Sequence, residues 1–190
     1  MKVMTILGSP KKKGNTAKVL GWLEEELEAQ GNQVSRTNII DREVRGCLGC
    51  LACQEKPDEP GCVQEDDTMA IFEEMMAADA VVYATPLYCW GFSSQMKALI
   101  DRHNCLATGY RTPDYKSVVE GKRTALLVTC DGPVENNADL IQECFSRLND
   151  YVKAIVVGKY VVPGWYTEPD SVLDKAKDTA KRMASDIAKT

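Results

Sequence analysis

The chain has 190 residues, of which 44% are apolar and 27% charged, the size and composition of one globular domain without a linker. The formal net charge of −5 disfavours binding to nucleic-acid phosphates, which requires a cationic face, so small molecules and proteins are the better partner candidates. The amino terminus lacks a signal-peptide pattern, and Asp79 and Pro86 interrupt the longest apolar stretch, 77–92, which excludes a membrane span.

Apolar strand patterns and helical periodicity alternate along the whole chain. The expected strands cover residues 2–7, 34–40, 80–85, 124–129 and 154–162, and the expected helices cover 15–30, 66–78, 93–106, 137–149 and 171–188. Such alternation predicts right-handed crossovers and a parallel sheet with helices on both faces, a three-layer α/β/α sandwich. For five strands we expect the flavodoxin-like order 2-1-3-4-5, with ligands at the carboxyl ends between the first and third strands.

The loop after the first strand has the composition of an anion site. It reads Ser9-Pro10-Lys11-Lys12-Lys13-Gly14-Asn15-Thr16 and leads directly into a helix. The free amides and dipole of a helix amino terminus favour a phosphate, and hydroxyl and carboxamide side chains add directed hydrogen bonds. A solvated, lysine-rich turn with a polar helix cap is the plainer alternative.

Other phosphate-handling proteins do not fit this loop. Five residues separate Gly8 from Gly14, and Asn15 stands where a Walker A loop has its lysine. A receiver domain needs an aspartate where this chain has Thr85-Pro86, and a low-molecular-weight phosphatase needs a cysteine in the first loop. The exclusions favour a mononucleotide phosphate.

The loop after the third expected strand is aromatic. It reads Thr85-Pro86-Leu87-Tyr88-Cys89-Trp90-Gly91-Phe92 and lies at the predicted switch point of the sheet. A flat ring could bind there, or the aromatic side chains could simply pack the loop against the core.

Three motifs together carry a family resemblance over nearly the whole chain. They are Gly8-Ser9-Pro10 through Gly14-Asn15-Thr16, Pro86-Leu87-Tyr88 with Gly91, and Lys97 with Asp101-Arg102. In these motifs the sequence resembles the NADPH-dependent FMN reductase and iron-sulfur flavoprotein superfamily, a branch of the flavodoxin-like fold.

The resemblance implies a set of FMN contacts. Ser9, Lys11, Gly14, Asn15 and Thr16 would hold the phosphate. The ribityl chain and the isoalloxazine ring would be framed by Pro86, Leu87, Tyr88, Trp90 and Gly91, with Thr129, Asp131 and Gly132 near the ring. It also implies a homodimer or homotetramer with the flavin near a subunit interface.

Four of the eight cysteines cluster in the loop at 41–66. Cys47, Cys50 and Cys53 are spaced as the first three ligands of a bacterial ferredoxin cluster, and Cys62 can supply a fourth thiolate because Pro57, Pro60 and Gly61 let the chain fold back. Structural zinc sites more often use two separated Cys-x-x-Cys pairs. Clustered thiols without a secretion signal also indicate a reducing, cytoplasmic compartment.

The cysteine loop resembles that of iron-sulfur flavoproteins, which implies a [4Fe-4S] cluster beside FMN, although the last gap is longer than the usual compact form. Free buried thiols, disulfides formed on oxidation, and a zinc-binding interaction module stay open as alternatives. We expect Cys89, Cys105, Cys130 and Cys144 to be small core residues.

The expected function is an oxidoreductase in which NAD(P)H reduces FMN and the electrons pass to a flavin, a quinone, another small acceptor or a ferredoxin-like protein. No catalytic acid–base pair is evident, because the redox chemistry belongs to the cofactor. The alternative is a non-enzymatic electron carrier or redox sensor. His103 is expected to be a surface residue or a satisfied hydrogen-bond partner, and residues 108–115 an ordinary connector, unless that segment covers the flavin.

Overall fold

The fold is built on a five-stranded parallel sheet. The computed structural model describes residues 1–55 and 61–189. The sheet order is β2-β1-β3-β6-β7, formed by Gln33–Asn38, Lys2–Leu7, Ala80–Pro86, Arg123–Thr129 and Ile155–Val162. All neighbouring strands of this sheet run parallel. The predicted order 2-1-3-4-5 and the flavodoxin-like α/β/α class are therefore confirmed.

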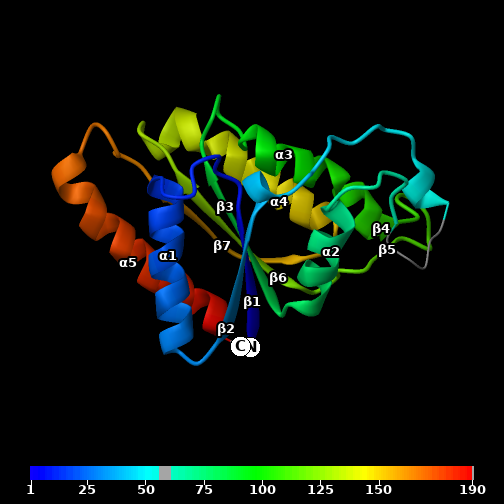
Figure 1. Cartoon of the computed structure of the whole chain (residues 1–190), viewed down its shortest axis with the longest axis horizontal. Coiled ribbons are helices and arrows are strands. Elements are labelled where there is room, and N and C mark those ends of the chain that lie inside the picture. Colours follow the sequence, from blue (N-terminus) through cyan, green and yellow to red (C-terminus); the bar gives the residue numbers. More distant parts are fainter. Residues whose placement is uncertain (56–60, 190) are drawn as a thin grey trace.

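Helices cover both faces of the sheet (Figure 1). One face carries α1 (Asn15–Ala29) and α5 (Pro169–Ala188), and the other carries α2 (Thr68–Ala77), α3 (Ser94–Asp101) and α4 (Asp139–Tyr151). Along β3, Val81 and Tyr83 face one layer of helices, whereas Val82 and Ala84 face the other. A strand buried on both faces needs such an uninterrupted apolar run, which is what residues 80–84 provide.

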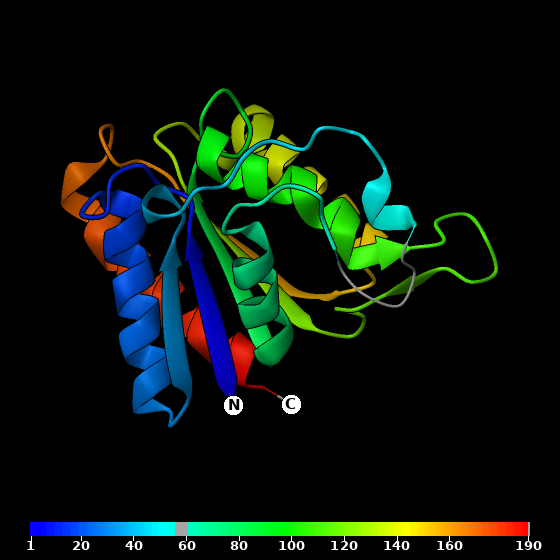
Figure 2. The ribbon, with the colours of Figure 1, turned by 45° about the vertical axis from the view of Figure 1, so that its right-hand side comes forward.

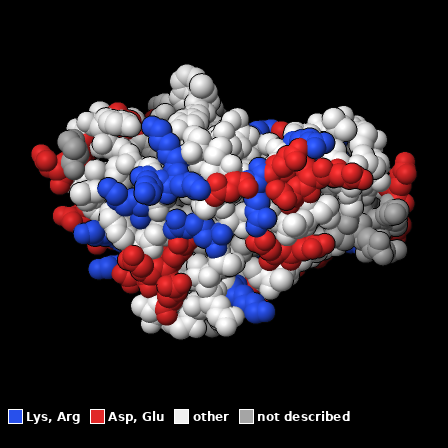
Figure 3. Space-filling model, viewed as in Figure 1, with Lys and Arg blue, Asp and Glu red and all other residues white. Residues whose placement is uncertain are grey.

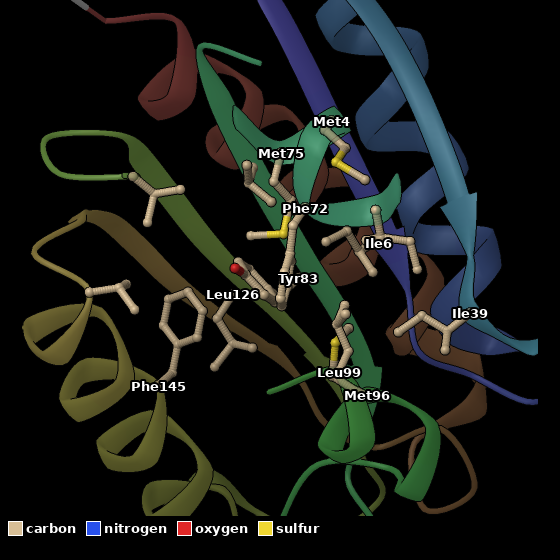
Figure 4. Packing of buried hydrophobic residues seen from close by; sticks show 14 of the residues in the cluster. Met4, Ile6, Ile39, Phe72, Met75, Tyr83, Met96, Leu99, Leu126 and Phe145 are labelled. Carbon is tan, nitrogen blue, oxygen red and sulfur yellow. The ribbon is translucent and has the colours of Figure 1, made fainter. Parts of the chain in front are cut away.

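The single histidine lies inside the core beneath α3. The His103 Nδ1 atom lies 3.0 Å from the Leu99 carbonyl oxygen and its Nε2 atom lies 2.9 Å from the Tyr83 hydroxyl. Because a carbonyl only accepts, Nδ1 carries the hydrogen and the Tyr83 hydroxyl donates to Nε2. Figure 4 shows Tyr83 among Phe72, Leu126 and Phe145, the apolar surroundings of this pair. Of the two expected alternatives, His103 is therefore a satisfied hydrogen-bond partner and not a surface residue.

The second expected strand and the helix expected at 93–106 both end earlier than their patterns predict. The strand stops at Asn38, and Ile39–Asp41 forms a 3-10 turn. The helix stops at Asp101, and Arg102–Leu106 continues as a 3-10 segment, η3, because its side chains are drawn into contacts with the cysteine loop described below.

Short elements occupy the connections. Ala52–Gln54 forms a 3-10 turn, η2, and Val134–Ala138 forms an irregular turn before α4, in which Glu135 and Asn136 have non-helical backbone angles. The segment 108–115, expected as a connector, links β4 (Ala107–Thr108) to β5 (Lys116–Ser117), an antiparallel pair whose turn projects from the body of the molecule (Figure 2).

Acidic and basic side chains are interspersed on the face shown in Figure 3. Several form ion pairs, such as Lys12–Asp41 and Arg36–Glu24. Within residues 1–55 and 61–189, no helix combines the length and the apolar character that a membrane crossing requires.

Candidate functional site

A pocket lies at the carboxyl edge of the sheet, where the loops after β1, β3, β6 and β7 meet. Its lining residues are Ser9, Lys11, Gly14, Asn15, Thr16, Pro86, Leu87, Tyr88, Thr129, Cys130, Asp131, Trp165 and Tyr166. Ligands of open parallel sheets bind at this edge, outside the point where the strand order reverses. Here that point lies between β1 and β3, as the sequence predicts.

The first loop presents a helix amino terminus to the pocket. Gly14 precedes α1, and the Ser9 hydroxyl accepts a 3.1 Å hydrogen bond from the Lys11 amide, which fixes the start of the turn. Of the three lysines, Lys11 lines the pocket, whereas Lys12 pairs with Asp41 at 2.9 Å. The first amides of an α-helix have no partner within the helix, so this end of the pocket favours an anion.

Gly8, just before this loop, allows β1 and α3 to approach closely. A Cβ atom at Gly8 would lie 2.7 Å from the Met96 Cβ atom, so any side chain would push α3 away. The Ser93 hydroxyl donates to the Gly8 carbonyl and accepts from the Met96 amide at 3.2 Å. Gly8 and Ser93 together therefore hold the loop at 9–16 against α3.

The second loop contributes Pro86, Leu87 and Tyr88 to the pocket. Tyr88 and Gly91 exchange backbone hydrogen bonds of 3.1 and 3.0 Å around a tight turn. Cys89 and Trp90 occupy its centre with φ values of 47° and 61°, a conformation that normally favours glycine or asparagine. This turn carries the Trp90 side chain to the surface, 58% exposed, so the predicted site residues Trp90 and Gly91 lie outside the pocket lining.

The third loop places Thr129, Cys130 and Asp131 in the pocket wall, whereas Gly132 lies outside it. The Thr129 hydroxyl is buried and hydrogen-bonded to the Thr16 hydroxyl. Asp131 does not present a free carboxylate. Its Oδ1 atom accepts from the Tyr166 amide at 2.7 Å and the Thr167 amide at 3.0 Å, and these bonds lower its pKa.

A fourth loop, after β7, brings Trp165 and Tyr166 to the site, which the sequence did not predict. The Trp165 Nε1 atom is buried and has no hydrogen-bond partner among the described residues. Cys130 was also missed, since it was expected only as a core residue. The available signal was an aromatic pair following the last strand, the same arrangement that marked the second loop.

The cysteine loop packs on η3. Cys47 and Cys50 are exposed, whereas Cys53 and Cys62 are partly buried beside Cys105 of η3. Burial and the two neighbouring thiols raise the pKa of Cys105. Burial opposes ionisation of Cys62 as well, but the Gln64 backbone and the Arg102 guanidinium outweigh it, and the pKa of Cys62 is lowered. Across residues 1–55 and 61–189, no three Cys, His, Asp or Glu side chains converge on a common metal position.

A buried ion pair ties both ends of the cysteine loop to η3. Arg102 donates to the Asp66 carboxylate at 2.7 Å and to the Arg45 carbonyl at 2.9 Å. Both charged groups have fully buried side chains. Burial raises the pKa of Asp66, but the hydrogen bonds from Arg102, Arg45 and Thr68 outweigh it and lower the value to about 2.

The expectation that the other four cysteines are core residues is half correct. Cys105 and Cys130 are buried. Cys89 is exposed because it lies at the centre of the tight turn of the second loop, and Cys144 is exposed on the outer face of α4, one residue before the buried Phe145.

Comparison with known sequences gives consistent matches. The sequence model of the NADPH-dependent FMN reductase family matches residues 1–166. An iron-sulfur flavoprotein of Archaeoglobus fulgidus is 33% identical over 190 residues, which cover 99% of this chain and 79% of that protein. An iron-sulfur flavoprotein of Methanosarcina thermophila is 38% identical over 102 residues, which cover 54% of this chain and 52% of that protein.

Solved structures share the fold at low sequence identity. The NAD(P)H:quinone oxidoreductase of Methanothermobacter marburgensis has a TM-score of 0.77 at 18% identity, covering 100% of this chain and 97% of the other. An FMN-dependent NADH-azoreductase of Bacillus anthracis, solved in complex with FMN, has a TM-score of 0.71 at 16% identity, covering both chains fully.

Proposed function

Because the chain belongs to the NADPH-dependent FMN reductase family and is an oxidoreductase, we propose that it binds FMN in the carboxyl-edge pocket and is reduced there by NAD(P)H. The observation that carries this proposal is the convergence of four separate loops on one pocket. The loops after β1, β3 and β6, which the sequence predicts, contribute side by side with the loop after β7, although they lie far apart along the chain.

The residues present fit a ligand rich in hydrogen-bond acceptors. The start of α1 offers free amides with Asn15, Thr16 and the Lys11 ammonium group, which suit the phosphate. The unpartnered Nε1–H of Trp165 is a buried donor in the same wall, and a buried donor without an acceptor costs free energy. We propose that an acceptor of the bound nucleotide satisfies it.

The chain's own groups position the cofactor and limit its exposure. FMN bound there would supply the hydride-accepting and electron-transfer chemistry. Pro86 and Leu87 form an apolar wall beside the buried hydroxyls of Thr16 and Thr129, and the half-exposed Tyr88 lies at the pocket mouth.

We propose further that Cys47, Cys50, Cys53 and Cys62 hold a [4Fe-4S] cluster that exchanges single electrons with the flavin. Four cysteine thiolates are the ligands that such a cluster takes, and the neighbouring N–H groups suit their sulfur atoms. An Asn104 N–H points at Cys53, and the buried Nε–H of Arg102, on the guanidinium beside Cys62, has no partner among the described residues. The names of the relatives from Archaeoglobus and Methanosarcina support the same reading.

The electron partners follow from this arrangement. A flavin alone would serve a small acceptor such as a quinone, whereas a cluster would also connect the chain to a ferredoxin-like protein. A homodimer or homotetramer remains a prediction of the family resemblance, and light scattering of the purified protein tests it.

One experiment tests both cofactors: an absorption spectrum of protein purified without oxygen, together with iron, sulfide and flavin analysis. We expect one FMN and four irons per chain. Protein that stays colourless after soaking with FMN would overturn the proposed function. Flavin bands without iron would overturn the cluster, and stoichiometric zinc without flavin would favour an interaction module.

Turnover separates a reductase from an electron carrier. FMN-loaded protein should oxidise NADH or NADPH with a quinone, free flavin or ferricyanide as acceptor. If neither nucleotide is oxidised, the non-enzymatic carrier is the correct function.

A further inference from the structure

Asn104 of η3 points an amide hydrogen at one of the cysteine thiols. Its Nδ2 atom lies 3.3 Å from the Cys53 Sγ atom, within hydrogen-bond range for sulfur. Cys53 in turn lies in η2, the short turn that docks on η3 through Gln54.

A tyrosine fixes the orientation of this amide. The Tyr151 hydroxyl, at the end of α4, lies 2.7 Å from the Asn104 Oδ1 atom. Burial raises the pKa of Tyr151 to about 12, so the phenol keeps its hydrogen and donates it. In this arrangement the Asn104 amide oxygen accepts from Tyr151 and the amide nitrogen faces Cys53.

The docking of η2 is independently secured. Gln54 Nε2 donates to the Asn104 carbonyl at 2.8 Å and to the Ala107 carbonyl at 2.9 Å. The backbone from Asn104 to Ala107 is therefore held against the turn that carries Cys53. A side-chain amide held between partners on two other elements, Tyr151 of α4 and Cys53 of η2, is preorganised, which is typical of groups that tune a bound metal centre.

We propose that Asn104, oriented by Tyr151, is a positioning residue that raises the reduction potential of the cluster bound at the cysteine loop. The inference rests on the cluster of the proposed function.

The physical reason is electrostatic. One-electron reduction adds one negative charge to a cluster and its sulfurs, and breaks no bond. An N–H donor at a ligand sulfur stabilises the reduced form more than the oxidised form, because a hydrogen bond strengthens with the charge of its acceptor. Removing the donor therefore makes the cluster harder to reduce.

The test is a redox titration of the full chain, purified without oxygen and followed by the electron paramagnetic resonance of the reduced cluster. Asn104→Leu removes the donor at similar volume. We expect about a tenfold lower ratio of reduced to oxidised cluster at a fixed potential, which corresponds to a midpoint about 59 mV more negative.

Tyr151→Phe is the second variant, because it keeps the ring and all of Asn104 and removes only the hydroxyl. A smaller shift in the same direction is expected. Tyr110→Phe is the matched control: its ring lies 5.2 Å from that of Tyr151, but its hydroxyl is not part of this hydrogen-bond chain. Its midpoint should equal that of the wild type.

The outcomes separate the inference from the proposal beneath it. A wild-type chain that holds no cluster after anaerobic purification and reconstitution would overturn both. The inference alone would be overturned if the wild type holds a cluster and the midpoint potential of Tyr151→Phe equals that of the wild type. Asn104→Leu must likewise show an unchanged potential where that variant retains the cluster. The same holds for an equal shift in Tyr110→Phe.

Discussion

The Thr16 and Thr129 hydroxyl oxygens lie 2.7 Å apart and join the first turn of α1 to the carboxyl end of β6. Both residues are buried at the pocket. Two hydroxyls carry two hydrogens, and one hydrogen suffices for the bond between them. The second hydrogen is left over, so this pair fastens the fold and, under the proposed function, donates to the bound nucleotide.

Thr129→Val should weaken FMN binding, because it removes one of these hydrogens while keeping the shape of the side chain. We expect a loss of about 1.5 kcal/mol, or about tenfold in Kd, the range for one hydrogen bond to a charged group. Quenching of FMN fluorescence during titration measures it. Thr124→Val is the control: this buried threonine lies on the same strand and bonds to Asn149, so its loss should reduce stability but not FMN affinity.

Trp165→Phe should have opposite effects on the free and the loaded protein. The buried Nε1–H without a partner costs the ligand-free chain roughly 1 to 3 kcal/mol, so phenylalanine should raise its thermal unfolding temperature. The same change removes a donor to the nucleotide and should lower FMN affinity. Calorimetric titration and thermal unfolding measure the two effects, with Trp22→Phe on α1 as control. Equal affinity would show that the indole does not bind the ligand.

Asp131→Ala should detach the loop that carries Trp165. The carboxylate holds the Tyr166 and Thr167 amides, and that loop contributes Trp165 and Tyr166 to the pocket lining. We expect weaker FMN binding and faster proteolytic cleavage at 164–168 in the ligand-free protein. Glu168→Ala is the matched control, since Glu168 pairs with Lys175 and Ser171 and makes no contact of this kind with the third loop. Equal cleavage rates in both variants would contradict the assigned role.

The difference between the predicted and observed site has a physical origin. Strand and helix patterns depend on local periodicity, so the sheet order and three of the four pocket loops could be predicted from the sequence. Trp165 follows the strand farthest from the switch point, and the hydrogen bonds of Asp131 to the next two residues help to hold it at the pocket. The carboxylate of Asp131 suggests a direct contact with the ligand. Its hydrogen-bond partners are instead backbone amides 35 and 36 residues away.

Contacts between residues far apart in the sequence also explain why α3 ends earlier than its pattern predicts. Residues 93–106 have helical periodicity, yet Arg102 and Asn104 bond to Asp66 and Cys53 across the cysteine loop. These long-range contacts outweigh local propensity, which differs by less than about 1 kcal/mol per residue.

Arg102→Met should strongly destabilise the fold, because it leaves the Asp66 carboxylate buried without its partner. Breaking one side of a buried ion pair costs roughly 3 to 5 kcal/mol. Urea unfolding measures the change. The double variant Arg102→Met with Asp66→Leu should recover part of the loss. Arg147→Met, which breaks an exposed pair with Glu143 on α4, should cost less than about 1 kcal/mol. A similar cost for both arginines would contradict the prediction.

His103 should make the fold less stable as the pH falls from about 6.5 to about 4. Burial lowers the pKa of His103 to about 4, although the hydrogen bond to Leu99 opposes the shift, so the folded chain keeps the ring neutral where the unfolded chain, with a pKa near 6.5, takes up a proton. Proton uptake by the unfolded state alone lowers the free energy of unfolding by about 1.4 kcal/mol per pH unit, or roughly 3 kcal/mol across this window. Above pH 6.5 the contribution is fully present.

His103→Gln isolates this effect, because glutamine can accept from Tyr83 and donate to Leu99 but gains no proton. Urea unfolding between pH 7.5 and 4.5 should show a steeper loss for the wild type than for the variant, while the carboxylates that titrate below pH 5 contribute equally to both. Since the chain has one histidine, no other imidazole can produce the difference. Parallel curves would mean that His103 can be protonated inside the core at little cost, with the Tyr83 hydroxyl then accepting from Nε2 instead of donating to it.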